Sequence, residues 1–176
     1  MSIQTWKVVS LATLTVLVIP TYAAIDGELG NTSTASININ LTVLPKIQIK
    51  QLEDFQMTVT EDTNANSVEQ IKSGCVVSNN QSGYYTLTAT NAQGESVNDQ
   101  YQMRDGKGGS VNYTMSAGNG DGNFQSITSH AVKLKADRSV NCSSGKNLQL
   151  KVQLTGAAQL KPGSYGDVVQ LQVVPL

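Results

Sequence analysis

Few residues in this chain of 176 could support chemistry. His130 is the only histidine, and it stands beside a polar stretch that looks like a surface strand. No GxSxG, HExxH or glycine-rich phosphate-binding motif occurs in the sequence. An enzyme needs acids, bases or nucleophiles positioned together. We therefore expect no enzymatic activity, no catalytic residues and no cofactor.

Two polar stretches carry the alternating oxygen side chains that calcium loops use, "DTNANS" from Asp62 and "NGDGNF" from Asn119. A helix-flanked calcium loop requires glycine at its sixth position and glutamate at its twelfth. The sixth positions here are Ser67 and Phe124, and neither stretch has the glutamate. Asn and Asp are also common turn residues because they hydrogen-bond locally. The two stretches are predicted to be turns, with no bound metal.

The first residues, "MSIQTWKVVSLATLTVLVIPTYAA", have the order of a secretory signal peptide. Lys7 precedes an apolar run, and Pro20 and the small residue Ala23 follow it. We expect cleavage after Ala23. The run is about 12 residues long, short of the roughly 20 that cross a membrane, so no membrane span is expected in the mature chain. An uncleaved anchor is the alternative.

Cys75 and Cys142 are the two cysteines. An exported chain reaches an oxidising compartment, where an even cysteine count favours a disulfide. Neither cysteine belongs to a CxxC pair, so thiol redox catalysis and zinc binding are not expected. The sequence predicts a Cys75–Cys142 disulfide.

The composition indicates an all-β protein that does not bind nucleic acid. Only 14% of residues are charged and the formal net charge is −1, without the clustered Lys and Arg of a nucleic-acid-binding face. Asn, Gln, Ser, Thr and Gly supply most of the polar positions, as in turn-rich β-proteins. The length fits one modest domain.

Apolar and polar residues alternate over residues 35–49, "ASININLTVLPKIQI". This period of two is typical of strands, but strands usually have five or six residues. Proline cannot donate a hydrogen bond to a sheet, so Pro45 divides the stretch in two. The first part would be a strand carrying Ala35, Ile37, Ile39, Leu41 and Val43 on one face, and the second would carry Ile47 and Ile49.

Further short stretches alternate or are apolar, with Gly, Asn, Asp or Ser between them. No stretch has a sustained helical period, so we expect little helix and a sandwich or barrel. The predicted strands are 54–60, 74–78, 84–90, 101–103, 111–117, 130–136 and 148–154, with a closing strand that carries Val169, Leu171 and Val173 inward.

The sequence stops where this closing strand stops. A sandwich that lacks a strand beside it would have an apolar groove with unpaired backbone groups, which favours strand addition. The face of residues 35–43 would be the donor for such a groove. The alternative is that residues 35–49 form one long bent strand within a complete monomeric sandwich.

The closing stretch "PGSYGDVVQLQVVPL" resembles the last strand of archaic chaperone-usher pilins and the related spore-coat-protein-U-like proteins. Other pieces resemble the same family: "IQIKQLEDF", "CVVSNNQSGYYTLTAT", "VNYTMSA" and the "NC" that ends at Cys142.

This resemblance implies an incomplete immunoglobulin-like sandwich that lacks its final strand. The expected organisation is a signal peptide (1–23), an extension with the donor strand (24–44) and a pilin-like domain (45–176). Ala35, Ile37, Ile39, Leu41 and Val43 would be the donor residues. Ile47, Ile49, Val169, Leu171 and Val173 would line the acceptor groove.

The resemblance also implies a function. The chain would be a surface pilus subunit that polymerises by donor-strand exchange and supports adhesion or biofilm formation. Its partners would be other pilin subunits, a periplasmic chaperone and an outer-membrane usher, and it would pass through the periplasm to the cell surface. The alternative function is a secreted monomeric sandwich that acts as an adhesin or binds a ligand.

Overall fold

The structure is a computed structural model that describes residues 25–60, 67–92, 98–128, 130–139, 141–142, 145–156 and 160–176. The predicted signal peptide and its cleavage site after Ala23 lie outside the described residues. The chain divides into two compact units, Met1–Val43 and Leu44–Leu176. In the first unit an isolated antiparallel bridge joins Ile25 and Ser36 through two backbone hydrogen bonds.

The second unit is a β-sandwich, and no helix occurs in the described parts of the chain. This confirms the predicted all-β sandwich. Its strands are β1 (Ile47–Lys50), β2 (Ser67–Ser78), β3 (Tyr84–Asn91), β4 (Tyr101–Arg104), β5 (Ser110–Gly118), β6 (Gln125–Ser126), β7 (Val132–Lys135), β8 (Leu148–Thr155) and β9 (Val169–Pro175).

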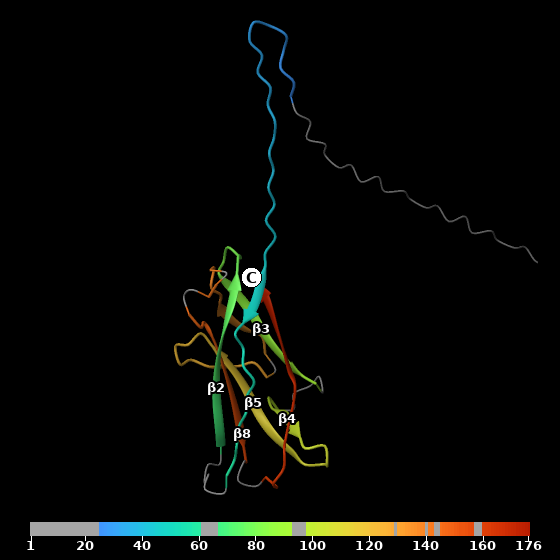
Figure 1. Ribbon diagram of the computed structural model, residues 1–176, viewed down its shortest axis with the longest axis vertical. Helices are drawn as coiled ribbons and strands as arrows, with labels where there is room; N and C mark the ends of the chain where they lie inside the picture. Colours follow the sequence, from blue (N-terminus) through green and yellow to red (C-terminus); the bar gives the residue numbers. More distant parts are fainter. Residues whose placement is uncertain are drawn as a thin grey trace, which may run out of the picture. The chain divides into compact units, whose positions relative to one another are not determined.

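The strands form two sheets (Figure 1). One has the order β1-β2-β8-β5-β4, with β6 beside β5, and the other has the order β7-β3-β9. All pairings between these strands are antiparallel. Leu87 of β3, Met115 of β5 and Leu150 of β8 belong to one buried cluster, so the core lies between the sheets.

The alternation in the sequence explains the layers. In β8 the side chains of Leu148, Leu150, Val152 and Leu154 are buried, and the polar residues between them are only partly covered. Successive strand side chains point to opposite faces, so one face of β8 enters the core. Burying a side chain of this size contributes about 1.5–3 kcal/mol.

The predicted strand at 54–60 is wrong. Phe55 and Met57 pack against the core, so the alternation is real, but the segment forms no β-ladder. Its hydrogen bonds come from a side chain instead. The amide of Gln70 accepts from the N–H of Gln56 at 3.1 Å and donates to the C=O of Gln56 at 3.2 Å. At the end of β1 the backbone of Gln51 has a positive φ of 58°, and this conformation interrupts the ladder between β1 and β2.

The strand predicted at 74–78 is too short, because β2 begins at Ser67. Its residues from Ser67 to Gly74 pair with β8, and its last residues, Cys75–Ser78, pair with β1. On the half-buried face of β2 two positions are polar, Gln70 and Lys72, so apolar and polar residues do not alternate there in the sequence. Both side chains bond to the segment after β1.

In the alternating stretch 35–49, only the residues from Ile47 onward belong to a strand, which is β1. Residues 37–46 have no regular secondary structure. Pro45 lies in this segment, and its missing N–H is one reason why the ladder with β2 does not continue past it.

Candidate functional site

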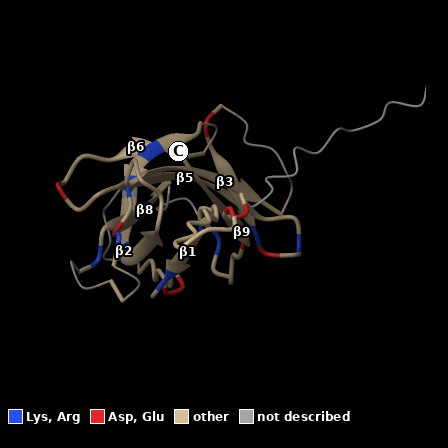
Figure 2. Cartoon of the chain, turned by 90° about the horizontal axis from the view of Figure 1, so that it is seen from above, with Lys and Arg blue, Asp and Glu red and all other residues tan. Residues whose placement is uncertain are grey.

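Two neighbouring strands each have one unpaired edge. Among the described strands, β1 pairs only with β2 and β9 pairs only with β3. β1 and β9 lie side by side (Figures 1 and 2), and no ladder joins them. Unpaired backbone donors and acceptors at such an edge are a template for another strand. The candidate functional site is this junction between the two sheets.

Half-buried apolar side chains line the junction. The residues that the sequence assigns to an acceptor groove, Ile47, Ile49, Val169, Leu171 and Val173, all lie on β1 or β9 and pack against the core. Apolar residues on the inner strands are almost fully buried, with Leu87 at 0% exposed and Leu150 at 2%. The junction is therefore less covered than the rest of the core. Its role as an acceptor stays a prediction.

Five more residues pack against the core in the same half-buried way, and the sequence did not assign them to the groove. One of them, Met103, lies on β4. Phe55 and Met57 follow β1, whereas Leu160 and Tyr165 precede β9. Alternation marks Phe55 and Met57 in the sequence, but nothing there shows that their segment continues the line of β1. These side chains extend the candidate groove beyond the two short strands.

The predicted donor residues lie in the first unit and are highly exposed. The exposed fractions are 72% for Ile37, 87% for Ile39, 86% for Leu41 and 70% for Val43. Ala35 is exposed as well. Asn38, Asn40 and Thr42 alternate with them, so the backbone can present all the apolar side chains on one face when it is extended. Such a row of exposed apolar side chains is a candidate contact surface.

One end of the junction is held by two consecutive asparagines. The side chain of Asn79 accepts from the N–H of Lys46 and donates to the C=O of Leu44 at 3.0 Å. The N–H of Asn79 also donates to the C=O of Lys46 at 3.2 Å. The side chain of Asn80 donates to the C=O of Leu176. The start of β1 and the end of β9 are therefore at the same end of the sandwich, and the two strands run in opposite directions.

The other end of β9 is fixed by a partly buried hydrogen bond. The hydroxyl of Tyr113 donates to Oδ2 of Asp167 at 2.7 Å. Burial raises the pKa of Tyr113, and the bond to the Asp167 carboxylate raises that pKa further. Backbone hydrogen bonds in both directions join Gly166 to Arg104 at the end of β4. Since Gly166 and Asp167 lie within three residues of Val169, where β9 begins, these contacts set where the strand begins.

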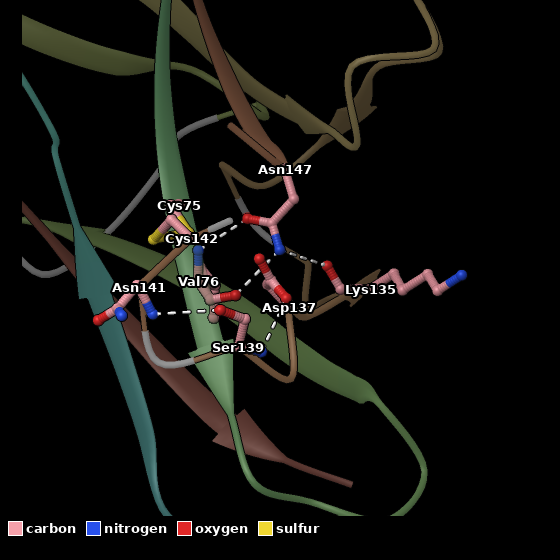
Figure 3. The surroundings of a disulfide bond; sticks show 8 residues. All are labelled: Cys75, Val76, Lys135, Asp137, Ser139, Asn141, Cys142 and Asn147. Carbon is pink, nitrogen blue, oxygen red and sulfur yellow. Dashed lines mark hydrogen bonds between the residues drawn. A yellow bond between two sulfur atoms is a disulfide. The ribbon is translucent and has the colours of Figure 1, made fainter. Parts of the chain in front are cut away.

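The predicted disulfide between Cys75 and Cys142 is confirmed (Figure 3). It joins β2 to the loop that leads into β8. In the same region, the side chain of Asn147 accepts from the N–H of Val76 at 2.8 Å and donates to its C=O at 2.9 Å. The part of β2 that pairs with β1 is thus held from its other side as well.

The described residues offer little for other kinds of site. No group of three or more His, Cys, Asp or Glu side chains in the described ranges could hold a metal ion. Within those ranges no helix has the length and apolarity to cross a membrane. Charged residues of both signs are scattered over loops and strands (Figure 2).

No protein-family model matches the chain, and no curated protein matches it. A solved structure is similar to it, with a TM-score of 0.48 and 15% sequence identity. The match covers 74% of this chain and 41% of the other, which belongs to a structure described as "Chaperone-tip adhesin complex is vital for synergistic activation of CFA/I fimbriae biogenesis". This chain therefore spans less than half of the length of that one.

Proposed function

We propose that this protein is a structural subunit of a surface fimbria that polymerises by donor-strand exchange. Residues 35–43 of one copy would add as a strand to the groove between β1 and β9 of another copy. One observation carries the proposal: a single chain has both an exposed alternating apolar segment and a pair of unpaired strand edges over a half-covered core.

The chemistry of the two parts is complementary. β1 and β9 approach to within 8 Å between Cα atoms, so an added strand would have to part them, because paired strands lie about 4.8 Å apart. It would then satisfy backbone groups at both edges, and its alternate side chains would pack between the half-buried residues. Burial of Ile37, Ile39, Leu41 and Val43 would contribute on the order of 6–12 kcal/mol before the cost of ordering the segment. A linkage of this strength suits a permanent fibre.

The proposed partners follow from the same site. Before assembly a periplasmic chaperone would cover the groove, and an outer-membrane usher would supply the next subunit, as the sequence resemblance implies. The assembled fibre would support adhesion or biofilm formation. The subunit itself would have a mechanical role with no catalytic step.

The test is to express the chain with export, and to compare periplasmic material unboiled and boiled on a denaturing gel. The proposal predicts a ladder of multimers that collapses on boiling. A variant that lacks residues 24–44 should give no ladder, because it has no donor segment. A full-length chain that remains monomeric without any chaperone even at high protein concentration would contradict strand exchange.

A further inference from the structure

We infer that Asn79 is a positioning residue that keeps the 35–43 segment out of the groove of its own chain, so that the occupant is a second copy. This inference rests on the proposed function. It starts from the directions of β1 and β9, which are opposite because the start of β1 and the end of β9 are held by Asn79 and Asn80 at the same end of the sandwich.

A strand between β1 and β9 could run in either direction. Because β1 and β9 run in opposite directions, the added strand would be antiparallel to one of them and parallel to the other. One of the two directions is antiparallel to β9. In that direction the segment would enter at the end that carries Leu176 and would place Val43 at the far end of the groove.

The chain's own segment cannot adopt that direction. β9 has seven residues and is about 20 Å long at roughly 3.3 Å per residue. Val43 is three residues before Lys46, and three residues span at most about 11 Å. Lys46 stays at the near end because Asn79 holds it there. A segment from another chain is free of this restriction.

The reverse direction is the only way for the segment to enter its own groove. Residues 35–43 would then pair with β1 as a hairpin, and residues 44–46 would form the turn. The structure opposes this turn. Asn79 binds Leu44 and Lys46 on either side of Pro45, and the hydroxyl of Ser78 donates to the C=O of Lys46 at 2.9 Å. These contacts hold the residues in line with β1.

The hydrogen bonds that Asn79 makes are therefore a switch between two outcomes. When they are made, the groove stays open for a second copy. When they are lost, residues 44–46 can turn and the chain can close on itself. The two side-chain bonds are exposed, and two hydrogen bonds in the lower part of the usual range of net strength correspond to about a tenfold shift in such an equilibrium.

The test compares Asn79→Ala with the parent and with Asn112→Ala, which removes an exposed asparagine on β5 that accepts a side-chain bond from Gln102 at 3.3 Å. Each chain, with its disulfide intact, is refolded at a concentration low enough to keep it monomeric. Hydrogen exchange is then measured for the amides of residues 35–43. The segment should exchange about tenfold more slowly in Asn79→Ala than in the parent and the control, and the multimer ladder should weaken in that variant alone.

A second variant guards against a folding defect in Asn79→Ala. A Gly-Asn-Gly insertion between Leu44 and Pro45 keeps every groove residue and gives the hairpin a permissive turn. It should also slow exchange in residues 35–43. Equal exchange in all monomers, with a normal ladder in all of them, would overturn the role of Asn79 and leave strand exchange intact. Absence of a ladder and of protection in every chain, including the parent, would overturn both.

Discussion

The side chain of Asn147 pairs with the backbone of Val76 as a neighbouring strand would, accepting at 2.8 Å and donating at 2.9 Å (Figure 3). Val76 is completely buried and faces the core next to the β1 pairing. Its C=O also accepts from the N–H of Asp137 at 2.8 Å, so the N–H of Val76 is the group that depends on Asn147.

Asn147→Ala should lower the free energy of unfolding by about 1–3 kcal/mol, because a buried N–H loses its acceptor. Asn147→Asp keeps the acceptor but places a carboxylate oxygen against the C=O groups of Val76 and Lys135, to which Asn147 donates, so it should cost at least as much. Urea denaturation measures both, and Asn112→Ala at an exposed position should change the stability by less than about 0.5 kcal/mol. Equal stability of Asn147→Ala and Asn112→Ala would show that the pairing contributes nothing.

Replacement of both Cys75 and Cys142 by serine should lower the free energy of unfolding by about 4 kcal/mol. The disulfide closes a sequence separation of 67 residues, and the loss of unfolded-chain entropy grows with the length of the closed loop. Guanidinium denaturation of the oxidised parent and of the double variant gives the difference. The parent measured with a thiol reductant should have the same stability as the double variant. A parent that keeps its denaturation midpoint after reduction would refute the estimate of about 4 kcal/mol.

Stability should fall as the pH rises above about 10. Burial raises the pKa values of Tyr85, Tyr101 and Tyr113 above the ordinary value of 10.0. The folded chain therefore keeps these protons at a pH where the unfolded chain releases them, so stability is fully present below pH 10 and is lost above it. Tyr113→Phe should make the decrease of stability with rising pH less steep, whereas Asn112→Ala should not. A urea midpoint series across alkaline pH measures the slopes, and identical slopes would contradict this assignment.

Ile39→Asp and Asn40→Asp add the same charge to neighbouring positions of the donor segment. Ile39 is 87% exposed, so Ile39→Asp should leave the stability of the monomer nearly unchanged. Ile39→Asp should abolish the boil-sensitive ladder, because a filled groove would bury the new carboxylate without a partner. Asn40→Asp should keep the ladder. Loss of the ladder in both variants, or in neither, would rule out the predicted face.

The alternation of apolar and polar residues correctly predicted strands that pair with other strands in the sheets. β3, β5, β8 and β9 lie close to their predicted positions because one face of each enters the core. The same rule gave a false strand at 54–60. Phe55 and Met57 do alternate into the core, but the ladder is replaced by the side chain of Gln70, which a period of two does not reveal.

The polar residues that hold the site could not be found from the sequence. Asn79, Asn80 and Asn147 look like the turn residues of a chain rich in asparagine. Each acts by bonding to a backbone group far away in the chain, for example Asn80 to Leu176. Such a role depends on tertiary structure, and a single sequence carries no local signal for it.

The pairing of β1 with β2 has a mechanical consequence. The chain enters β1 at Lys46, beside the end of β2, and runs antiparallel to β2 away from that end. A pull on Leu44 along the axis of β1 would load the hydrogen bonds to Cys75–Ser78 together, in shear, and would not open them one after another like a zipper. At the far end of this ladder, Lys50 pairs with Cys75, which the disulfide ties to Cys142. Tension carried through the extension would therefore reach a point of the fold that is covalently anchored.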